Sequence, residues 1–455
     1  MNYPGYISDS QPALLDQPPE KVAHTLRSKG IRVFYFITDP STGKVSTSHE
    51  CLQSIAQSLE DHLLSFDGHE GIFCQVSDYV DVIYGVFVHR TLRGQGQGGT
   101  RFWDYQTLAD FLRDGLRLSQ AMTHKNALAG LWWGGGKGVI TRPVELSRTD
   151  HPLRRKLFAE YGRFISSLRG CYIAAEDVGT TTDDMSAIFS ETRFATCIPH
   201  TKGGSGNPSN MTALGVIRGM EAGLDFISGH HRNGQTPSYR KSPLRGKHIV
   251  VQGVGHVGKE IISLALKSGA RVTATDINVG RLDQLRDIWH GQPVELVCTQ
   301  PDDLTPFDIQ CDVLCPAATG GILNPSSIPH IKASLICGAA NNQLENPDRD
   351  GALLSERRVL YLPDFLVNRM GIVKCANEQY GSVTHDLMQH LDYTWEHSVY
   401  QTSLRVLSHA QNTLKHPHTA AVHLAEDRSR IMHPIWGHRG QKIIHSISDP
   451  ANFES

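Results

Sequence analysis

Residues 248–276 read HIVVQGVGHVGKEIISLALKSGARVTATD, and this stretch decides the expected fold. The apolar run HIVVQG predicts a buried strand, VGKEIISLALKSG predicts a helix that ends at Gly269, and RVTATD predicts the next strand. Three glycines between the first strand and the helix have the GxGxxG spacing: Gly253, Gly255 and Gly258. A strand, a glycine-rich turn and a helix in this order are typical of a dinucleotide-binding βαβ unit.

Each glycine of this turn has its own physical reason. Gly253 permits the tight turn, Gly255 lets the backbone approach a pyrophosphate, and Gly258 allows the helix to pack closely on the strand. His256 and Val257 stand at the start of the helix, where backbone N–H groups are available for phosphates. These five residues are therefore expected to bind the cofactor.

Asp276 ends the next strand, about 20 residues after the turn. Its carboxylate would accept hydrogen bonds from both ribose hydroxyls and would repel a 2′-phosphate, which favours NAD over NADP. Residues 253–259 also fit GxxxxGK, the start of a triphosphate-binding loop. That loop needs Ser or Thr next to hold Mg²⁺, and this chain has Glu260. A purely structural glycine turn is the remaining alternative.

Further short apolar runs follow, and each ends in Pro or Gly: CDVLCP, ASLICG and RVLYLP. Strands that alternate with helices predict an α/β fold with a doubly wound, Rossmann-type NAD-binding domain. Residues 226–245 are polar and are expected to form a loop insertion. The expected organisation is two domains with a cleft. Residues 1–49 are expected to form an N-terminal extension with a hairpin. Residues 50–198 are expected to form the substrate, catalytic and oligomerisation domain, which C-terminal helices within 405–455 complete. Residues 199–404 are expected to form the NAD-binding domain.

The N-terminal half has weaker signals. Prolines at positions 4, 12, 18 and 19 predict an irregular start, and IRVFYFITDPSTGKVSTS predicts a strand, a turn and a second strand. Residues 71–88 are rich in strand signals. A glycine-rich turn at 94–99 is expected before a helix whose apolar stripe runs from Leu108 to Met122. That helix is expected to end in a glycine loop.

Composition bounds the class of protein. The 455 residues are 39% hydrophobic, which is enough for a sizeable core and favours two or three domains. A net charge of −2 gives no reason to expect nucleic acid or an anionic membrane as a partner. The nine cysteines form no CxxC pair and the 24 histidines have no paired metal-ligand spacing, so reduced thiols and no metal site are expected. Without a signal sequence or a membrane-spanning run, the chain is expected to be cytoplasmic.

Residues 130–140, GLWWGGGKGVI, look like a phosphate loop because glycines precede Lys137. The triphosphate pattern GxxxxGK[ST] fails on both sides of the lysine. Leu131 stands where the first glycine should be, and Gly138 stands where Ser or Thr is needed. Lys137 is therefore not expected to bind a triphosphate.

Five blocks of sequence resemble the amino acid dehydrogenases of the glutamate, leucine, phenylalanine and valine family, in that family's order. The blocks are MTHKNALAGLWWGGGKGVI, YIAAEDVGTTTDDM, GSGNPSNMTALGVIRGM, GAANNQL and YLPDFLVNRMGIVKCANEQYG. They leave the N-terminal extension unmatched. The segments AEDVGTT and TDIN make the chain more similar to the leucine and phenylalanine dehydrogenases than to the glutamate members.

The resemblance implies a homo-oligomeric enzyme and gives roles to particular residues. Lys137 matches the catalytic lysine, and Asp177 matches the catalytic carboxylate. Lys125 matches the lysine that binds the substrate carboxylate. Thr212 matches a threonine near the nicotinamide, and Asn342 matches an asparagine that bridges substrate and cofactor.

The expected reaction removes a hydride from Cα and adds water to the imine. Asp177 can move protons as a general acid/base, and an ammonium at Lys137 can stabilise the oxygen charge that develops at the carbinolamine. Lys125 would orient the substrate by pairing with its carboxylate. Because two ammonium groups repel each other, the pKa of a lysine here should fall toward a useful range.

The remaining expected contacts are less sharply defined. At the substrate they are Gln97, Gly98, Ala175, Ile372 and Cys375. At the cofactor they are Ala317 and Asn341, since either of the adjacent asparagines could face the ligand. Gln97 stands where members with apolar substrates commonly have leucine and glutamate members have lysine, so this neutral side chain argues against glutamate. Trp132 and Trp133 are expected to pack in the core rather than to touch substrate.

The leading hypothesis is reversible, NAD-dependent oxidative deamination of a neutral, mostly apolar L-amino acid, branched-chain or aromatic, to its 2-oxo acid and ammonia. Two alternatives stay open. The same reaction could act on a polar or unusual amino acid, or the chain could be a catalytically weak NAD-binding paralogue. The presence of Lys125, Lys137 and Asp177 counts against the paralogue.

Overall fold

The computed structural model describes residues 13–143, 151–230, 242–381 and 384–447. The chain divides into two compact units. Unit 1 comprises Met1–Thr123, Trp133–Ile198 and Met432–Ser455, and unit 2 comprises His124–Trp132 and Pro199–Ile431. The chain thus passes more than once from one unit to the other.

Unit 1 contains a seven-stranded mixed sheet with the strand order β2-β1-β3-β4-β6-β5-β7. Its strands are β1 (Val33–Thr38), β2 (Val45–Thr47), β3 (Gly71–Val76), β4 (Ile83–Arg90), β5 (Gly96–Trp103), β6 (Gly134–Thr141) and β7 (Tyr172–Glu176). Neighbours from β2 to β6 are antiparallel, whereas β5 runs parallel to both β6 and β7. The carboxyl ends of β5, β6 and β7 therefore lie at one edge of the sheet.

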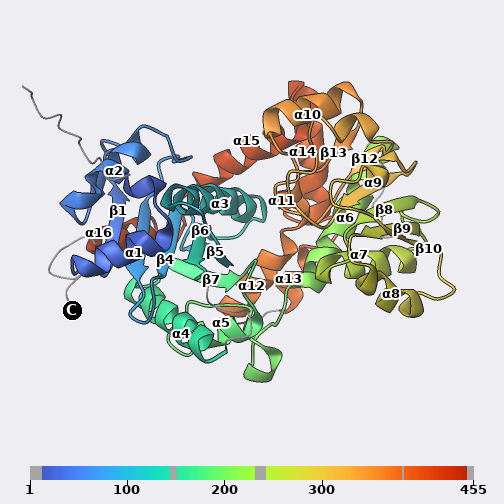
Figure 1. Cartoon of the computed structure of the whole chain (residues 1–455). Coiled ribbons are helices and arrows are strands. Elements are labelled where there is room, and N and C mark those ends of the chain that lie inside the picture. Colours follow the sequence, from blue (N-terminus) through green and yellow to red (C-terminus); the bar gives the residue numbers. More distant parts are fainter. Residues whose placement is uncertain (1–12, 144–150, 231–241, 382–383, 448–455) are drawn as a thin grey trace, which may run out of the picture. The chain divides into compact units, whose positions relative to one another are not determined.

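Helices cover both faces of this sheet (Figure 1). They are α1 (Pro19–Ser28), α2 (Gln53–Glu60), α3 (Leu108–Leu128, through Thr123), α4 (His151–Ser167), α5 (Thr182–Phe189) and α16 (Arg439–Ile447). On one face, Phe111 of α3 packs against Phe87 of β4, with ring centroids 5.6 Å apart. On the other face, Phe158 of α4 packs against Phe102 of β5. The helix α16 returns to the start of β3, where its neighbour His438 pairs with Glu70 at 3.0 Å.

Unit 2 contains a six-stranded parallel sheet with the order β10-β9-β8-β11-β12-β13. Its strands are β8 (His248–Gln252), β9 (Arg271–Asp276), β10 (Val294–Cys298), β11 (Val313–Pro316), β12 (Leu335–Ile336) and β13 (Leu360–Tyr361). Ile249 and Val251 pack into one apolar cluster, and Val250 between them packs into another. Because successive side chains of a strand point to opposite faces, both faces of this sheet are covered, as a doubly wound fold requires.

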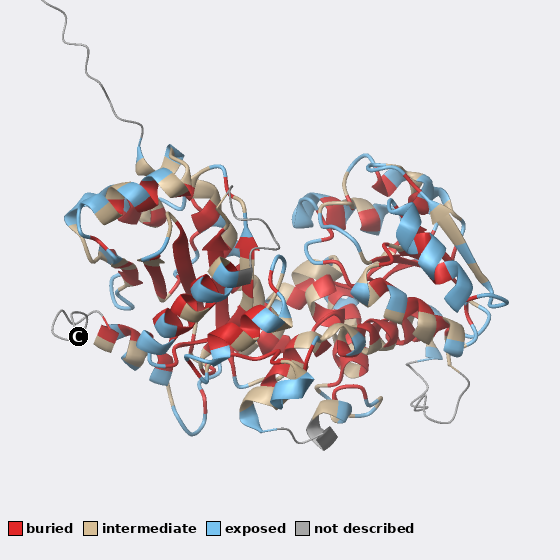
Figure 2. Cartoon of the chain, turned by 60° about the horizontal axis from the view of Figure 1, so that its bottom comes forward, coloured by how far each residue is buried: buried red, intermediate tan, exposed pale blue. Residues whose placement is uncertain are grey.

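The helices of unit 2 surround this sheet and continue to the C-terminal segment. They are α6 (Ser209–Ile227), α7 (His256–Lys267), α8 (Val279–Ile288), α9 (Thr305–Asp308), α10 (Pro347–Glu356), α11 (Asp364–Val367), α12 (Met370–Tyr380), α13 (Thr384–Gln389), α14 (Val399–Thr413) and α15 (Pro417–Ser429). Short 3-10 helices lie at Leu14–Asp16, Glu50–Leu52, His200–Lys202 and Ile328–His330. Figure 2 shows that the inner strands of both sheets are buried and that most helices have one buried and one exposed face, whereas the edge strand β10 is only partly buried. None of the helices in the described ranges has the length and apolar character of a membrane span.

The α/β class and the doubly wound second half are confirmed, but the start of the chain differs from expectation. The expected hairpin forms as β1 and β2, and it joins the body of unit 1, where β1 pairs with β3 inside the sheet. Pro18 and Pro19 do not make this part irregular, because Pro19 begins the helix α1. Proline suits the first helical position, where the backbone N–H has no helical partner. Pro4 and Pro12 lie outside the described residues.

The two glycine-rich segments that read as turns are buried strands. Gly96–Trp103 is β5, and Gly134–Thr141 is β6 with every residue buried. Gly135 shows why side chains are absent here: an added Cβ would lie 2.0 Å from the hydroxyl oxygen of Thr123 on α3. Glycine in these strands marks close approach of a helix backbone rather than a bend.

The C-terminal segment is also arranged differently. It is helical as expected, but α14 and α15 belong to unit 2, and only the part from Met432 onward belongs to unit 1. The expected loop insertion at 226–245 overlaps the end of α6, which runs through Ile227. Residues 231–241 of that segment lie outside the described residues. Apolar periodicity locates a helix, but it does not show which body the helix packs on.

Candidate active site

Lys137 and Asp177 form a buried ion pair in unit 1. Lys137 lies in the middle of β6, and Asp177 follows the end of β7. The strand β5 lies between them, and Gly99 of β5 leaves the space that the pair occupies, since an added Cβ there would lie 2.6 Å from the Cβ of Asp177. The Lys137 Nζ donates to Asp177 Oδ2 at 2.6 Å.

The pKa values of this pair are shifted by burial and by mutual attraction. Burial lowers the pKa of Lys137, and the negative charge of Asp177 opposes that effect without cancelling it. Burial alone would raise the pKa of Asp177, but the charges of Lys137 and Arg101 outweigh burial and hold that pKa below its usual value. A cation and a carboxylate in contact, both shielded from water, are suited to proton transfer and to stabilising charge on a reacting oxygen.

Sequence reasoning missed the residues that support this pair. Arg101 of β5 donates to Asp177 Oδ2 at 3.2 Å and to both carboxylate oxygens of Asp114 on α3. The Tyr105 hydroxyl donates to Asp114 Oδ2 at 2.7 Å. Once β5 is known to be a strand, Arg101 can be placed on the same face as Gly99, two residues before it, because alternate residues of a strand share a face.

Gln97 lies on the same strand, two residues before Gly99. Its ladder neighbours are Gly135 of β6 and Ile173 of β7. Its side chain is 0% exposed, and neither amide atom has a hydrogen-bond partner among the described residues. By strand alternation, Gln97 lies on the face that holds Lys137.

Gly98 and Ala175 stand close to this group. An added Cβ at Gly98 would lie 1.8 Å from the carbonyl oxygen of Gly136, so only glycine fits there. Ala175 of β7 pairs with Gly99 and is 4% exposed. The structure therefore brings together, in unit 1, five of the residues predicted from sequence. They are Gln97, Gly98, Lys137, Ala175 and Asp177.

The other residues predicted at the substrate lie in unit 2. Lys125 is half-buried near the end of α3, and its charge opposes the rise that burial causes in the pKa of Asp364. Ile372 and Cys375 lie one helical turn apart on α12 and are 7% and 3% exposed. Asn342 is exposed in the loop after β12 and has a positive φ of 52°.

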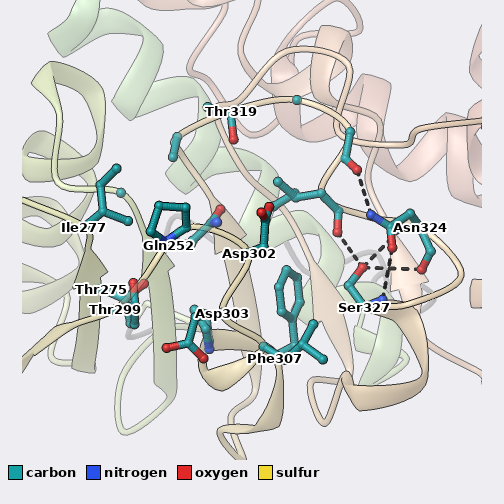
Figure 3. Close-up of a pocket in the computed structure, with 18 of the residues that line it drawn as sticks. Gln252, Thr275, Ile277, Thr299, Asp302, Asp303, Phe307, Thr319, Asn324 and Ser327 are labelled. Carbon is teal, nitrogen blue, oxygen red and sulfur yellow. Dashed lines mark hydrogen bonds between the residues drawn. The ribbon is translucent and has the colours of Figure 1, made fainter.

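A pocket of about 920 Å³ opens beside the carboxyl ends of β8 and β9 in unit 2. Figure 3 shows side chains of Gln252, Ile277 and Thr319 around it, with hydrogen bonds that tie Asn324 to Ser327 at its far side. Four of the residues predicted at the cofactor line it: Gly253, Gly255, Asp276 and Ala317. Crevices at the carboxyl ends of parallel strands are where α/β sheets bind ligands.

The glycine turn has the geometry that a pyrophosphate needs. Gly253 has a φ of 101°, a conformation that side chains disfavour. An added Cβ at Gly258 would lie 2.0 Å from the carbonyl oxygen of Gly253, whereas one at Gly255 would meet nothing within 4 Å. The space over Gly255 and the start of α7 at His256 therefore fit a dinucleotide.

Asp276 lines this pocket, and hydrogen bonds fix its carboxylate. It accepts hydrogen bonds from the backbone N–H of Val254 at 2.9 Å and of Asn278 at 2.8 Å. Arg281, which was not predicted, lies 3.9 Å from it and also lines the pocket. Asp276 as a residue is 8% exposed and lines the pocket, so its carboxylate presents a negative charge where the adenosine ribose of a dinucleotide would bind.

The remaining cofactor predictions lie elsewhere in unit 2. Val257 follows His256 in the first turn of α7 and is half-buried. The Thr212 hydroxyl, on the first turn of α6, donates to the carbonyl of Pro208 at 3.1 Å. Asn341 accepts a hydrogen bond from Asn368 at 2.7 Å. No group of three or more His, Cys, Asp or Glu side chains able to hold a metal occurs in the part of the chain that the structure describes.

Comparison with protein families identifies the family of this chain. Residues 74–194 match the family model for the Glu/Leu/Phe/Val dehydrogenase dimerisation domain, and residues 203–428 match the model for glutamate/leucine/phenylalanine/valine dehydrogenase. The chain belongs to this dehydrogenase family. It is therefore an oxidoreductase of the class that acts on CH–NH₂ groups with a nicotinamide cofactor.

Individual relatives agree with this family. The chain is 35% identical to a leucine dehydrogenase of Geobacillus stearothermophilus over 82% of this chain and 94% of the relative. It is 34% identical to a valine dehydrogenase of Streptomyces coelicolor, over 79% and 92%. Among solved structures, L-tryptophan dehydrogenase from Nostoc punctiforme matches with a TM-score of 0.64 and 28% identity, over 83% of this chain and 98% of that one. The similarity thus includes dehydrogenases named for aliphatic and for aromatic amino acids.

Proposed function

We propose that the protein catalyses the reversible, NAD-dependent oxidative deamination of a neutral, mostly apolar L-amino acid, branched-chain or aromatic, to its 2-oxo acid and ammonia. The observation that supports this proposal most directly is the buried ion pair of Lys137 and Asp177. The leucine, valine and tryptophan dehydrogenases to which the chain is similar support the class of substrate.

In the proposed reaction, the bound cofactor supplies the hydride acceptor. Asp177 takes a proton from the substrate amine or from water and returns it in the reverse direction. Lys137 contacts Asp177 and stabilises the charge that develops on the carbinolamine oxygen. Lys125 pairs with the substrate carboxylate and fixes the orientation of Cα. Thr212 and Asn342 are proposed to position the nicotinamide and the substrate.

NAD is proposed as the cofactor in preference to NADP because of Asp276. A fixed carboxylate would accept hydrogen bonds from a free ribose and repel a 2′-phosphate, although Arg281 stands close enough to bind such a phosphate if the carboxylate were absent. Replacing Asp276 with Ser should therefore reduce the ratio of the NADH to the NADPH affinity, measured by fluorescence titration. An unchanged ratio would refute this assignment.

A second candidate substrate class rests on Gln97. A buried amide without a partner costs free energy, so a leucine would serve an aliphatic substrate better. A polar or unusual substrate whose side chain carries a hydrogen-bonding group, such as a hydroxyl, would pair with this amide. This candidate is the same reaction on a different side chain.

The proposal extends to assembly and location. The match of residues 74–194 to a dimerisation domain supports a homo-oligomer. All nine cysteines are unpaired, which supports a reducing compartment such as the cytoplasm.

The test is a panel of L-amino acids with NAD, followed by the absorbance of the reduced cofactor. Aliphatic, aromatic and polar side chains separate the two substrate classes. Lys137→Ala and Asp177→Asn should each reduce kcat by at least 10²-fold, in line with the loss of a proton-transfer or charge-stabilising group. Lys156→Ala, on the exposed side of α4, is the matched control and should be unaffected.

The outcomes separate the hypotheses. Turnover that survives in Lys137→Ala would remove the proposed role of the lysine. Measurable NADH binding without turnover of any amino acid would instead favour a catalytically weak NAD-binding paralogue.

A further inference from the structure

Two cations meet on one oxygen of Asp177. Lys137 Nζ lies 2.6 Å from Oδ2, and Arg101 Nε lies 3.2 Å from the same atom. All three side chains are less than 20% exposed, so solvent screens their charges weakly. The guanidinium therefore acts on the carboxylate that is proposed to move protons, and through it on the lysine.

Arg101 is held from its other side by a carboxylate of its own. Its Nη1 lies 2.9 Å and 3.2 Å from the two oxygens of Asp114, and the Tyr105 hydroxyl donates to one of these oxygens. The Asp114 side chain is 13% exposed. The guanidinium thus bridges two carboxylates, and its distance from Asp177 is fixed by α3 as well as by β5.

The charged and titratable groups that face Lys137 come from several elements. Arg101 comes from β5, Asp114 comes from α3, and Asp177 follows β7. Arg117, an exposed residue of α3, lies 3.6 Å from Asp114. Two tyrosines lie close to these groups, Tyr105 beside Asp114 and Tyr172 on β7. Burial raises the pKa of both phenols, so both remain neutral near physiological pH.

We propose that Arg101 is a positioning residue that sets the proton distribution in the Lys137–Asp177 pair, and that Asp114 limits its effect. The guanidinium repels a proton from Lys137 and from Asp177, whereas the Asp114 carboxylate attracts one. The balance of these two fixed charges determines the pH range in which the pair can exchange a proton with substrate. The kinetic part of this inference rests on the proposed function.

The two charges have opposite signs, so their removal has opposite effects. Without the Arg101 charge, the pKa of Lys137 rises. Because the proposed reaction uses Lys137 as an ammonium, the falling limb of the pH profile of kcat/KM, where that proton is lost, moves to higher pH. Without the Asp114 charge, Arg101 acts unopposed, the pKa of Lys137 falls, and the same limb moves to lower pH. A residue that only maintained the fold would lower activity at every pH without moving the limb.

The experiment compares pH profiles of the full-length enzyme and its variants with one amino acid substrate. Arg101→Met should move the limb up by about one unit or more, Asp114→Asn should move it down, and Arg101→Lys should restore most of the original position. Arg113→Met is the matched control, because Arg113 pairs with Asp110 on the exposed side of α3 and should not move the limb.

A second readout does not depend on turnover. Competitive acetylation with acetic anhydride across a pH series, read by mass spectrometry of the Lys137 peptide, reports the titration of that amine directly. The midpoint of this titration should shift to higher pH in Arg101→Met and to lower pH in Asp114→Asn. If both variants fold but their midpoints shift in the same direction or stay unchanged, the inference is wrong, whatever the outcome of the activity panel.

Discussion

Replacing Gln97 with leucine should stabilise the free protein. Both amide atoms of Gln97 are buried without a partner among the described residues. Burying an unpaired amide costs about 1–3 kcal/mol in proteins. Leucine has one side-chain heavy atom fewer, which leaves a small cavity that costs about 1 kcal/mol at most. The net expectation is a gain of about 1–2 kcal/mol in the free energy of unfolding, or roughly 2–8 °C in Tm.

The assay is urea unfolding of the ligand-free protein, followed by tryptophan fluorescence. The matched control is Gln95→Leu, because the Gln95 amide donates to the carbonyl of Gly170 at 2.5 Å. Losing that hydrogen bond should reduce stability by about 0.5–1.5 kcal/mol. The two glutamines stand two positions apart and should therefore respond with opposite signs.

The same variant also tests the substrate class. Gln97→Leu should raise kcat/KM for leucine, and it should lower kcat/KM for a substrate that hydrogen-bonds to the amide. If Gln97→Leu instead destabilises the protein as much as Gln95→Leu does, the amide is satisfied in the free protein. The argument for a hydrogen-bonding substrate then loses its foundation.

Two further predictions concern other parts of the chain. Gly255→Ala should fold with unchanged stability but bind NADH at least tenfold more weakly, whereas Gly258→Ala should destabilise unit 2, because its Cβ would collide with the carbonyl of Gly253. Thermal unfolding and NADH titration separate the two effects. Glu160→Gln should reduce the free energy of unfolding by about 2–4 kcal/mol, because the buried carboxylate accepts hydrogen bonds from two hydroxyls and a backbone N–H; a loss below about 1 kcal/mol in urea unfolding would contradict this.

The second half of the chain was predictable because local signals agree there. The apolar run before Gly253, the spacing to Gly258 and Asp276 at the next strand end all require the same βαβ unit. The strand β10 was not predicted; it lies at the sheet edge and its residues are only partly buried. Boundaries between the units were beyond sequence reasoning, since they depend on which surfaces pack together.

The candidate site was predictable only in part. Lys137, Asp177 and Lys125 stood out through the resemblance, which preserves their sequence context. Arg101 did not, because its importance comes from its distances to Asp177 and Asp114, which the sequence does not show. The orphan amide of Gln97 was likewise invisible, because a sequence shows a polar residue but not whether its neighbours can bind it.

The glycines around Lys137 explain why this region misled sequence reasoning and why it can hold the site. Gly135 lets α3 approach β6, and Gly99 leaves the space in which Lys137 reaches Asp177 across β5. Side chains at these positions would favour strands by propensity but would separate the ion pair. A sheet that brings a lysine and an aspartate into contact across an intervening strand needs an intervening residue without a side chain. The ion pair therefore requires glycine at position 99, although glycine has a low strand propensity. The sequence around Gly99 suggests a turn only while the neighbouring strands are unknown.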